Sequence, residues 1–432
     1  MIRFIYNLFW PIGLLFFLPG YFTKMIRRGG YREKFGQRLG IYDRELRDCL
    51  SKQRSTWLHA VSVGEVNIAL KLATALRTLE PDLRCVLTTT TTTGFALARK
   101  HAPPWMEITY TPLDYGPVMR RAFSVIRPVR ILLIEAEVWP NLAGEAHMRQ
   151  IPLVLVNARL SPRSERRYRR FRFFVAPIFR LLDLVCVPEE EDVERWGALG
   201  VPPDRVHVTG SIKFDPDGQP ESQAAGTSLR DVLPAVRSES LVLFGGSTHR
   251  GEEKMLAEIF LRLRQRFPFL RLFIAPRHVE RLPEIRADLR VFPLHVALAS
   301  ESQEGHDADA DCVLLDTTGE LQRWYGIATV VFVGKSLTSH GGQNPVEAIF
   351  AGKPVLFGPH MENFATLARR LVSNNGAIQI ADPDSLEGAI AELLRDADAR
   401  KRLVQNARAI LSEHQGAAAR AAALVHELRL TL

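Results

Sequence analysis

The stretch that decides the fold is SHGGQNPVEAIFAGKPVLFGPHMENF, residues 339–364. The residues before it, 327–334 (IATVVFVG), are apolar and β-branched, as in a buried parallel strand. Gly341 and Gly342 then allow a tight turn, and a short apolar run at 354–357 is typical of a second strand. The order of strand, glycine turn, helix and strand predicts an open parallel α/β sheet.

The glycine turn and the helix after it form a candidate ligand site. In an open α/β sheet, ligands bind beyond the carboxyl ends of the strands, where backbone N–H groups and helix N-termini can bind a phosphate. Asn344 suits the start of the helix, and Glu347 in its first turns could accept hydrogen bonds from a ribose diol. The alternative is that the glycines only turn the chain and that Glu347 is solvated. We predict ligand contacts at Gly341, Gly342, Asn344 and Glu347.

Strands and helices alternate in the same way along the rest of the chain. With 432 residues and 46% hydrophobic composition, the chain is too long for one ordinary core and fits two α/β lobes. We predict a first lobe at 24–214, a Pro/Gly-rich linker at 215–235, a second lobe at 236–410 and a C-terminal helix at 411–432. The expected strands are 56–63, 84–89, 108–111, 129–134, 153–157 and 184–187 in the first lobe, and 241–244, 270–274, 313–315, 330–333 and 355–357 in the second.

The first residues, 1–23, are a candidate membrane anchor. Residues 4–22 carry no charged side chain, and a helix of that length would reach about 28 Å, close to the hydrocarbon thickness of a bilayer. Two prolines, a glycine and the polar Asn7 weaken this helix, so a segment lying in the interface is the competing interpretation. A helix buried in its own domain is the third. The basic residues at 24–38 predict that the body of the protein is cytoplasmic.

The net charge calls for an acidic partner. The formal charge is +8 and the sequence pI is near 9.4, which suits nucleic acid, an anionic membrane or a phosphorylated substrate. Residues 162–174 (PRSERRYRRFRFF) interleave six arginines with aromatic residues, a pattern that suits RNA or lipid phosphates, or an ordinary solvated helix face. The apolar N-terminus favours the anionic membrane over nucleic acid.

The four cysteines predict neither disulfides nor zinc. They are scattered, with no C-x-x-C pair and no Cys/His cluster at zinc spacing. We therefore expect a reducing compartment and no bound metal.

Acidic residues follow two strands of the first lobe. Glu65 in SVGEV lies where a strand turns into a helix, and there it could take a proton from an attacking hydroxyl; its alternative role is to stabilise the helix N-terminus. Glu135 and Glu137, in LIEAEVWPNL, are two residues apart and follow the predicted strand at 129–134. On an extended chain both would point to one face, although one could instead face solvent.

A candidate phosphate site opens the second lobe. LVLFGGSTHRGEE, residues 241–253, is interpreted as a strand, a Gly-Gly-Ser-Thr turn and a helix start, which would aim a helix N-terminus at an anion. The contacting residues would be Ser247, Thr248 and His249. Arg277 and His278 end the next strand and would lie at the same sheet edge, unless they belong to a solvated loop.

These motifs together resemble a known family. Residues 339–364 look like the donor-binding signature of GT-B glycosyltransferases, and SVGE and E-x-E-x-W-P-N resemble bacterial 3-deoxy-D-manno-octulosonic acid (Kdo) transferases. A histidine is common in that family where this chain has Gln343, so a donor contact at 343 stays open. The resemblance implies an α/β GT-B fold of two Rossmann-like lobes with parallel sheets facing an interlobe cleft, and a last helix that packs back on the first lobe.

The resemblance also implies an activity. It is transfer of Kdo from CMP-Kdo to a phosphorylated lipid A precursor (lipid IVA), with inversion, without metal or cofactor, at the cytoplasmic face of the inner membrane in lipopolysaccharide synthesis. Glu65 would be the base and Glu137 a supporting acid. Kdo carries a carboxylate, so Arg159 and Lys213, which follow first-lobe strands, would contact the donor unless they form structural salt bridges.

Three other functions compete with this one. Another GT-B transferase would use a UDP-sugar and a lipid acceptor, and a GT-B-like nucleotide-sugar 2-epimerase would need no lipid. A non-enzymatic RNA- or membrane-binding module would explain the arginines but not the acids after the strands.

Overall fold

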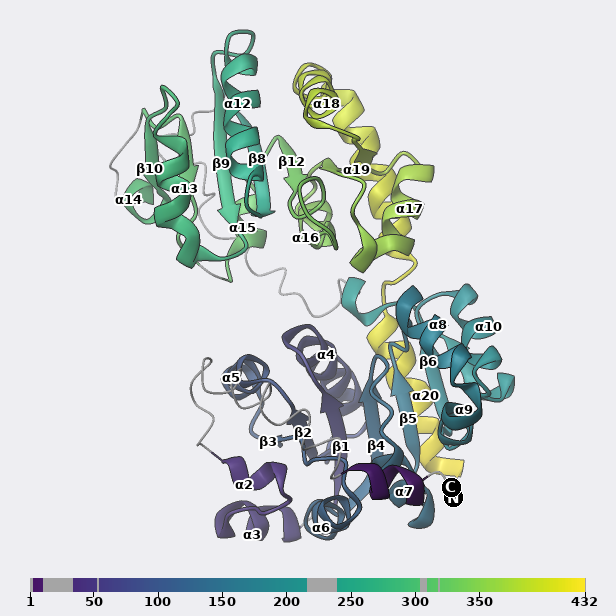
Figure 1. Ribbon diagram of the computed structural model, residues 1–432. Helices are drawn as coiled ribbons and strands as arrows, with labels where there is room; N and C mark the ends of the chain where they lie inside the picture. Colours follow the sequence, from purple (N-terminus) through teal and green to yellow (C-terminus); the bar gives the residue numbers. More distant parts are fainter. Residues whose placement is uncertain are drawn as a thin grey trace. The chain divides into compact units, whose positions relative to one another are not determined.

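The computed structural model describes residues 3–10, 34–52, 54–215, 239–303, 309–317 and 319–431. The chain divides into two compact units (Figure 1). One comprises Met1–Gly218 and His414–Leu432, and the other Gln219–Glu413. Apart from Asp215, the predicted linker lies outside the described residues.

The first unit is built on a seven-stranded sheet in the order β3-β2-β1-β4-β5-β6-β7, with every pair parallel. The order reverses between β1 and β4, where Leu58 pairs with Leu132. Loops after these two strands therefore leave in opposite directions and open a crevice at the sheet's carboxyl edge. The strands are β1 (Ser55–Ala60), β2 (Cys85–Thr89), β3 (Met106–Tyr110), β4 (Pro128–Ile134), β5 (Leu153–Val156), β6 (Leu184–Val187) and β7 (Val206–Val208).

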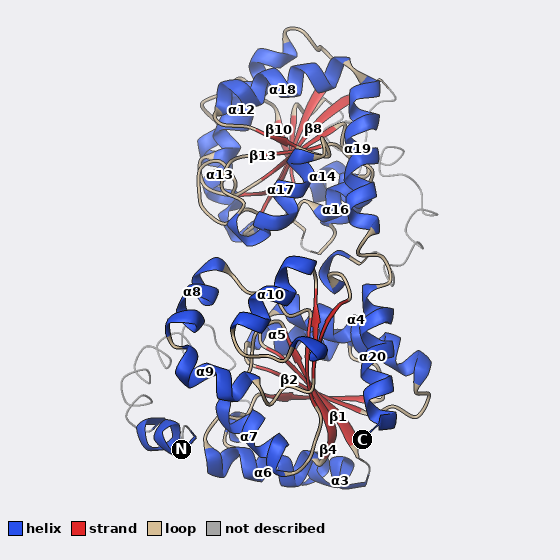
Figure 2. Cartoon of the chain, turned by 90° about the vertical axis from the view of Figure 1, so that its right-hand side faces the viewer, coloured by secondary structure: helices blue, strands red, loops and turns tan. Residues whose placement is uncertain are grey.

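Alternate residues of the strands pack into two hydrophobic cores, one on each face of this sheet. Trp57, Ile131 and Leu133 belong to one core, and Leu58 and Leu132 belong to the other. Helices cover both faces, as the red strands between blue helices show in Figure 2. Besides residues 3–10, the helices are α2 (Phe35–Arg38), α3 (Arg44–Lys52), α4 (Val63–Leu79), α5 (Thr92–His101), α6 (Gly116–Ile126), α7 (Pro140–Met148), α8 (Pro162–Arg170), α9 (Arg172–Phe179), α10 (Glu190–Ala198) and α20 (Ala417–Thr431), with short η1 (Pro203–Arg205) and η2 (Ile212–Phe214).

The second unit repeats the design with the order β10-β11-β9-β8-β12-β13-β14, again parallel. Its strand order reverses between β8 and β12. The strands are β8 (Leu241–Thr248), β9 (Leu270–Pro276), β10 (Val296–Leu298), β11 (Cys312–Leu314), β12 (Val330–Val333), β13 (Val355–Phe357) and β14 (Ile378–Gln379). The helices are α12 (Glu252–Arg264), α13 (Leu282–Leu289), α14 (Ala299–Gln303), α15 (Leu321–Tyr325), α16 (Val346–Phe350), α17 (Ala365–Ser373), α18 (Pro383–Arg395) and α19 (Ala397–Ser412), with η4 (Val279–Arg281) and η5 (Glu362–Phe364).

The glycine pair that was expected to form a turn lies inside β8. Gly245 and Gly246 pair with Ile274 and Ala275 of β9. A Cβ on Gly245 would lie 2.5 Å from Leu256 Cδ1, and a Cβ on Gly246 would lie 2.1 Å from the Tyr325 hydroxyl oxygen. The two glycines are thus packing residues, and the prediction of a turn at this point is wrong.

The last helix returns to the first unit and packs on α4. Ala417, Ala421 and Ala422 of this helix are fully buried, and such small side chains let the two helices approach closely. The carboxylate of Asp215 accepts N–H groups of Gly416 and Ala418 and so caps the start of α20. In Figure 1 the yellow α20 lies beside α4 and β5.

A buried ion pair joins α20 to the sheet. Arg130 of β4 donates to both carboxylate oxygens of Glu80 at 2.8 Å, and both side chains are almost fully buried. His426 of α20 places its Nδ1 2.9 Å from Glu80 Oε1.

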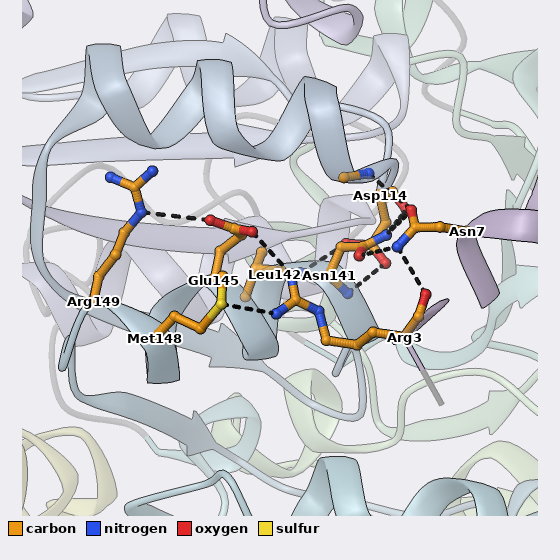
Figure 3. A network of polar contacts seen from close by, with 9 residues as sticks. Arg3, Asn7, Asp114, Asn141, Leu142, Glu145, Met148 and Arg149 are labelled. Carbon is orange, nitrogen blue, oxygen red and sulfur yellow. Dashed lines mark hydrogen bonds and ion pairs between the residues drawn. The ribbon is translucent and has the colours of Figure 1, made fainter. Parts of the chain in front are cut away.

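A network of polar contacts holds the N-terminal helix, residues 3–10, against α7 (Figure 3). Arg3 donates to Glu145 at 2.8 Å, and Asn7 and Asn141 exchange hydrogen bonds of 2.8 and 3.0 Å. Asp114, which accepts the first N–H groups of α7, completes the network. The helix is therefore fixed to the first unit through one face.

The opposite face of this helix is apolar and exposed. Phe4, Leu8 and Phe9 are 72%, 59% and 58% exposed. Within the described residues no helix is both long and apolar enough to cross a bilayer. Most of the predicted anchor, residues 11–23, lies outside them.

We predict that Glu80→Ala lowers the free energy of unfolding by about 3–5 kcal/mol, because it leaves the buried Arg130 guanidinium unpaired. Urea unfolding followed by circular dichroism measures this change. The double variant Glu80→Leu/Arg130→Met removes both charges and should recover most of the loss. A Glu80→Ala variant as stable as the natural chain would contradict this account of the pair.

Candidate active site

Glu65 stands at the crevice of the first sheet, in the first turn of α4. Ser62 is the N-cap residue of this helix, and its side chain accepts the N–H of Glu65. In return, the carboxylate of Glu65 accepts the Val61 N–H at 2.7 Å and the Ser62 hydroxyl at 2.9 Å. The side chain is mostly buried, since Glu65 is only 8% exposed. The same contacts that start the helix hold the carboxylate in one orientation.

Glu135 and Glu137 follow β4, the strand beside β1 across the reversal of strand order. Glu135 has a positive φ of 63°, so the chain turns there and does not continue extended. The expectation that both acids share a strand face is therefore wrong in its geometry. Both nevertheless lie close enough to Glu65 for their negative charges to raise the pKa of Glu65.

The electrostatics of this site favour a proton acceptor that works near neutral pH. Burial, followed by the charges of Glu135 and Glu137, raises the pKa of Glu65 to about 7, although hydrogen bonds from Val61 and Ser62 oppose the shift. Burial and the charge of Glu135 also raise the pKa of Glu137, against a hydrogen bond from Trp139. A carboxyl with a pKa of about 7, such as that of Glu65, can take up and release a proton at physiological pH.

Two basic residues lie at the end of β5, two strands away from β1. Asn157 has a positive φ and accepts the Ile212 N–H at 3.0 Å, which fixes η2 and its Lys213 at this edge. Arg159 follows two residues later, near Asp192; burial raises the pKa of Asp192, and the charges of Arg195 and then Arg159 oppose that shift. The predicted pair thus shares one sheet edge with Glu65.

In the second unit, basic side chains gather near the reversal between β8 and β12. His249 follows β8, and Arg277 and His278 follow β9, with the His249 and His278 ring centroids 6.0 Å apart. Burial lowers the pKa of His249, and the charges of Lys335 and His278 add to this effect. Lys335 was not among the predicted residues. Its position in the sequence, directly after the apolar strand β12 and Gly334, could have indicated it.

A carboxylate at the start of α12 binds backbone N–H groups of the two neighbouring loops. Glu252 accepts N–H groups from His249 at 2.8 Å, Lys335 at 2.8 Å and Ser336 at 3.2 Å. Thr248 is fully buried and donates to Glu253 at 3.0 Å. Of the three residues predicted here, Ser247 has a positive φ of 53° at the irregular end of β8. Glu252 therefore joins the loop after β8 to the loop after β12, and anion binding at the start of α12 stays a prediction.

The glycine turn after β12 has the predicted form. Gly341 and Gly342 have φ values of 114° and 67°, which side chains rarely tolerate. Asn344 accepts the Val346 N–H at 3.2 Å and lies 3.4 Å from a carboxylate oxygen of Glu347, in the first turn of α16. The turn and the acid are thus held together at one edge of the sheet.

Comparison with known proteins identifies the family. The family model described as 3-Deoxy-D-manno-octulosonic-acid transferase (kdotransferase) matches residues 33–216. A 3-deoxy-D-manno-octulosonic acid transferase of Haemophilus influenzae is 32% identical over 388 residues, covering 90% of this chain and 89% of that protein. One from Bordetella pertussis is 33% identical over 378 residues, covering 84% and 85%. The chain belongs to the Kdo transferase family.

Solved structures add the fold of this Kdo transferase family member. A UDP-GlcNAc 2-epimerase from Neisseria meningitidis gives a TM-score of 0.56 at 13% identity, covering 88% of this chain and all of that one. Another UDP-N-acetylglucosamine 2-epimerase gives 0.57 at 14%, covering 87% and 95%. At these identities the likeness shows only the shared fold of two Rossmann-like units. Family membership makes the protein a glycosyltransferase.

We predict that transferase turnover rises with pH through about 7, because the ionised form of Glu65 accepts the proton and burial has raised its pKa. Glu135→Gln removes one neighbouring negative charge, so the rising limb should move to lower pH. Initial rates measured between pH 5 and pH 9 test both statements. A profile that is flat across neutral pH, or unmoved in Glu135→Gln, would contradict them.

Proposed function

We propose that the protein transfers Kdo from CMP-Kdo to a phosphorylated lipid A precursor, lipid IVA, in lipopolysaccharide synthesis. The observation that carries the proposal is the buried, oriented carboxyl of Glu65 with its pKa near 7, in a member of the Kdo transferase family. No metal or other cofactor enters the chemistry that we propose.

In the proposed reaction, Glu65 removes the proton of the acceptor hydroxyl as its oxygen attacks the anomeric carbon of Kdo. The bond from that carbon to the phosphate oxygen breaks on the opposite side, so the configuration inverts and CMP leaves. Val61 and Ser62 orient the Glu65 carboxylate. Glu137 supports the base because its negative charge helps to raise the pKa of Glu65.

The donor is bound by residues at the edge of the second sheet. Glu347 accepts the ribose hydroxyls, beside the turn of Gly341 and Gly342, and Asn344 orients the acid. The negative charge that grows on departing CMP is stabilised by His249, Arg277, His278 and Lys335, together with backbone groups at Ser247. Thr248 acts indirectly by fixing Glu253, and Arg159 and Lys213 contact the carboxylate of Kdo.

We predict that Arg277→Ala and Lys335→Ala each weaken CMP-Kdo binding by about 10- to 100-fold, the usual effect of losing a hydrogen bond to a charged group. Arg286→Ala, which removes an exposed arginine from α13, is the matched control and should bind normally. Calorimetric titration measures all three. Unchanged binding in both site variants would remove this edge from the donor site.

The product identifies the reaction directly. Purified protein, CMP-Kdo and lipid IVA should give a lipid that mass spectrometry shows to be heavier by one or more Kdo residues. Parallel reactions with UDP-sugars test for a transferase with another donor, and UDP-GlcNAc alone tests for the epimerase whose fold the chain shares. Epimerised UDP-GlcNAc or transfer from a UDP-sugar, without transfer from CMP-Kdo, would overturn the proposal.

We further propose that the first unit works on the cytoplasmic face of the inner membrane. The helix at 3–10 presents Phe4, Leu8 and Phe9 away from the network in Figure 3, and α9 presents Phe173, 72% exposed, next to the arginines of α8. Both helices contact α7. A helix fixed by its polar face with its apolar face exposed favours an interfacial position over a spanning one.

We predict that the triple variant Phe4→Ser/Leu8→Ser/Phe9→Ser lowers binding to vesicles of anionic phospholipid at least several-fold, because its exposed apolar face is lost. Phe269→Ser, which changes an exposed phenylalanine of the second unit, is the matched control. Flotation of protein with vesicles measures binding. Equal flotation of the triple variant and the natural chain would exclude this face from the membrane contact.

A further inference from the structure

Two histidines and a glutamate from separate loops converge beside the glycine turn of the second unit. His340 follows β12, and His360 and Glu362 follow β13. Glu362 Oε1 lies 3.2 Å from His340 Nδ1 and 3.4 Å from His360 Nδ1, and the two imidazole centroids are 4.0 Å apart. Among the described residues, no other group of three such side chains brings its ligand atoms within 4.8 Å of one another.

We propose that His340, His360 and Glu362 bind a divalent transition-metal ion, with Zn²⁺ the best fit. Bonds of about 2.0–2.1 Å in a tetrahedral site place neighbouring ligand atoms about 3.3–3.4 Å apart. The two nitrogen–oxygen distances match this spacing. A charge-assisted hydrogen bond would instead close to about 2.7–2.9 Å.

The donor set selects the class of metal. Two imidazole nitrogens and one carboxylate suit Zn²⁺, Co²⁺ or Ni²⁺, whereas Mg²⁺ and Ca²⁺ prefer oxygen ligands. Three protein ligands leave a fourth position for water. The exposure of His340 and Glu362 gives the ion a path from solvent.

A neighbouring backbone group orients the carboxylate. Its second oxygen, Oε2, accepts the Gly341 N–H at 2.6 Å, so Oε1 is directed at the two imidazoles.

The ion would add a link between two loops that already touch. Asn363 N–H donates to the Gly341 carbonyl at 2.9 Å, and a Cβ on Gly342 would lie 2.5 Å from Met361 Sδ. A bound ion would join the loop after β12 to the loop after β13 through their side chains as well. The ion has no part in the proposed transfer reaction, and the site stands whether or not the turn binds CMP. It departs from the expectation of no bound metal, because ligands 20 residues apart do not show in local spacing.

The test uses the full chain without a polyhistidine tag, in detergent, after EDTA treatment and dialysis. Titration with Co²⁺, followed by visible absorption, and with Zn²⁺, followed by calorimetry, should show one saturable site. His340→Ala, His360→Ala and Glu362→Gln should each bind at least about tenfold more weakly. His207→Ala, an exposed histidine on β7, is the matched control and should bind like the natural chain.

Two results would overturn the proposal. One is the absence of saturable Co²⁺ or Zn²⁺ binding below millimolar concentration in the natural chain. The other is equal binding by the three site variants and the control. Unfolding midpoints measured without metal show whether each variant is folded, and at saturating Zn²⁺ the midpoint of the natural chain should rise while that of His340→Ala/His360→Ala should not.

Discussion

The reversal of strand order at the centre of each parallel sheet is the constraint on which the rest of the structure depends. In the first sheet, β1 and β4 are neighbours although two strands lie between them in the sequence. Their loops leave in opposite directions, so Glu65 and Glu137 meet at one crevice. The same reversal in the second sheet brings His249 after β8 near Lys335 after β12. In each unit, therefore, the strand order brings the residues of the candidate site together, and their side-chain chemistry acts only within that arrangement.

Topology alone would leave Glu65 poorly placed, because burying a negative charge beside two others is unfavourable. Two short hydrogen bonds from Val61 and Ser62 offset part of that cost. The part of this cost that the hydrogen bonds do not offset raises the pKa of Glu65. A carboxyl that is held firmly yet ionises near neutrality is what a general base requires, and the surrounding fold maintains it at some cost in stability.

Sequence reasoning recovered the alternation of strands and helices, the turn at Gly341 and Gly342, and the position of Glu65 at a strand-to-helix junction. These features have local signals in hydrophobic runs and in residues that tolerate positive φ. Gly245 and Gly246 were misinterpreted as a turn because their purpose, space for Leu256 and Tyr325, depends on partners distant in sequence.

Other features escaped for the same reason. The three-residue β7 is too short for a periodic pattern, and the turn at Glu135 has no glycine to signal its positive φ. The network around Asn7 and the convergence of His340 with Glu362 join residues that only the fold brings together. The main candidate acids were predictable, whereas their exact surroundings were not.

The most direct test of the central claim is the turnover of Glu65→Gln with CMP-Kdo and lipid IVA. The amide keeps the size of the side chain and can still accept a hydrogen bond, but it cannot take a proton. The account predicts that kcat falls by about 10²- to 10⁴-fold, while CMP-Kdo binding measured by calorimetry stays nearly unchanged. Turnover close to that of the natural chain would contradict it.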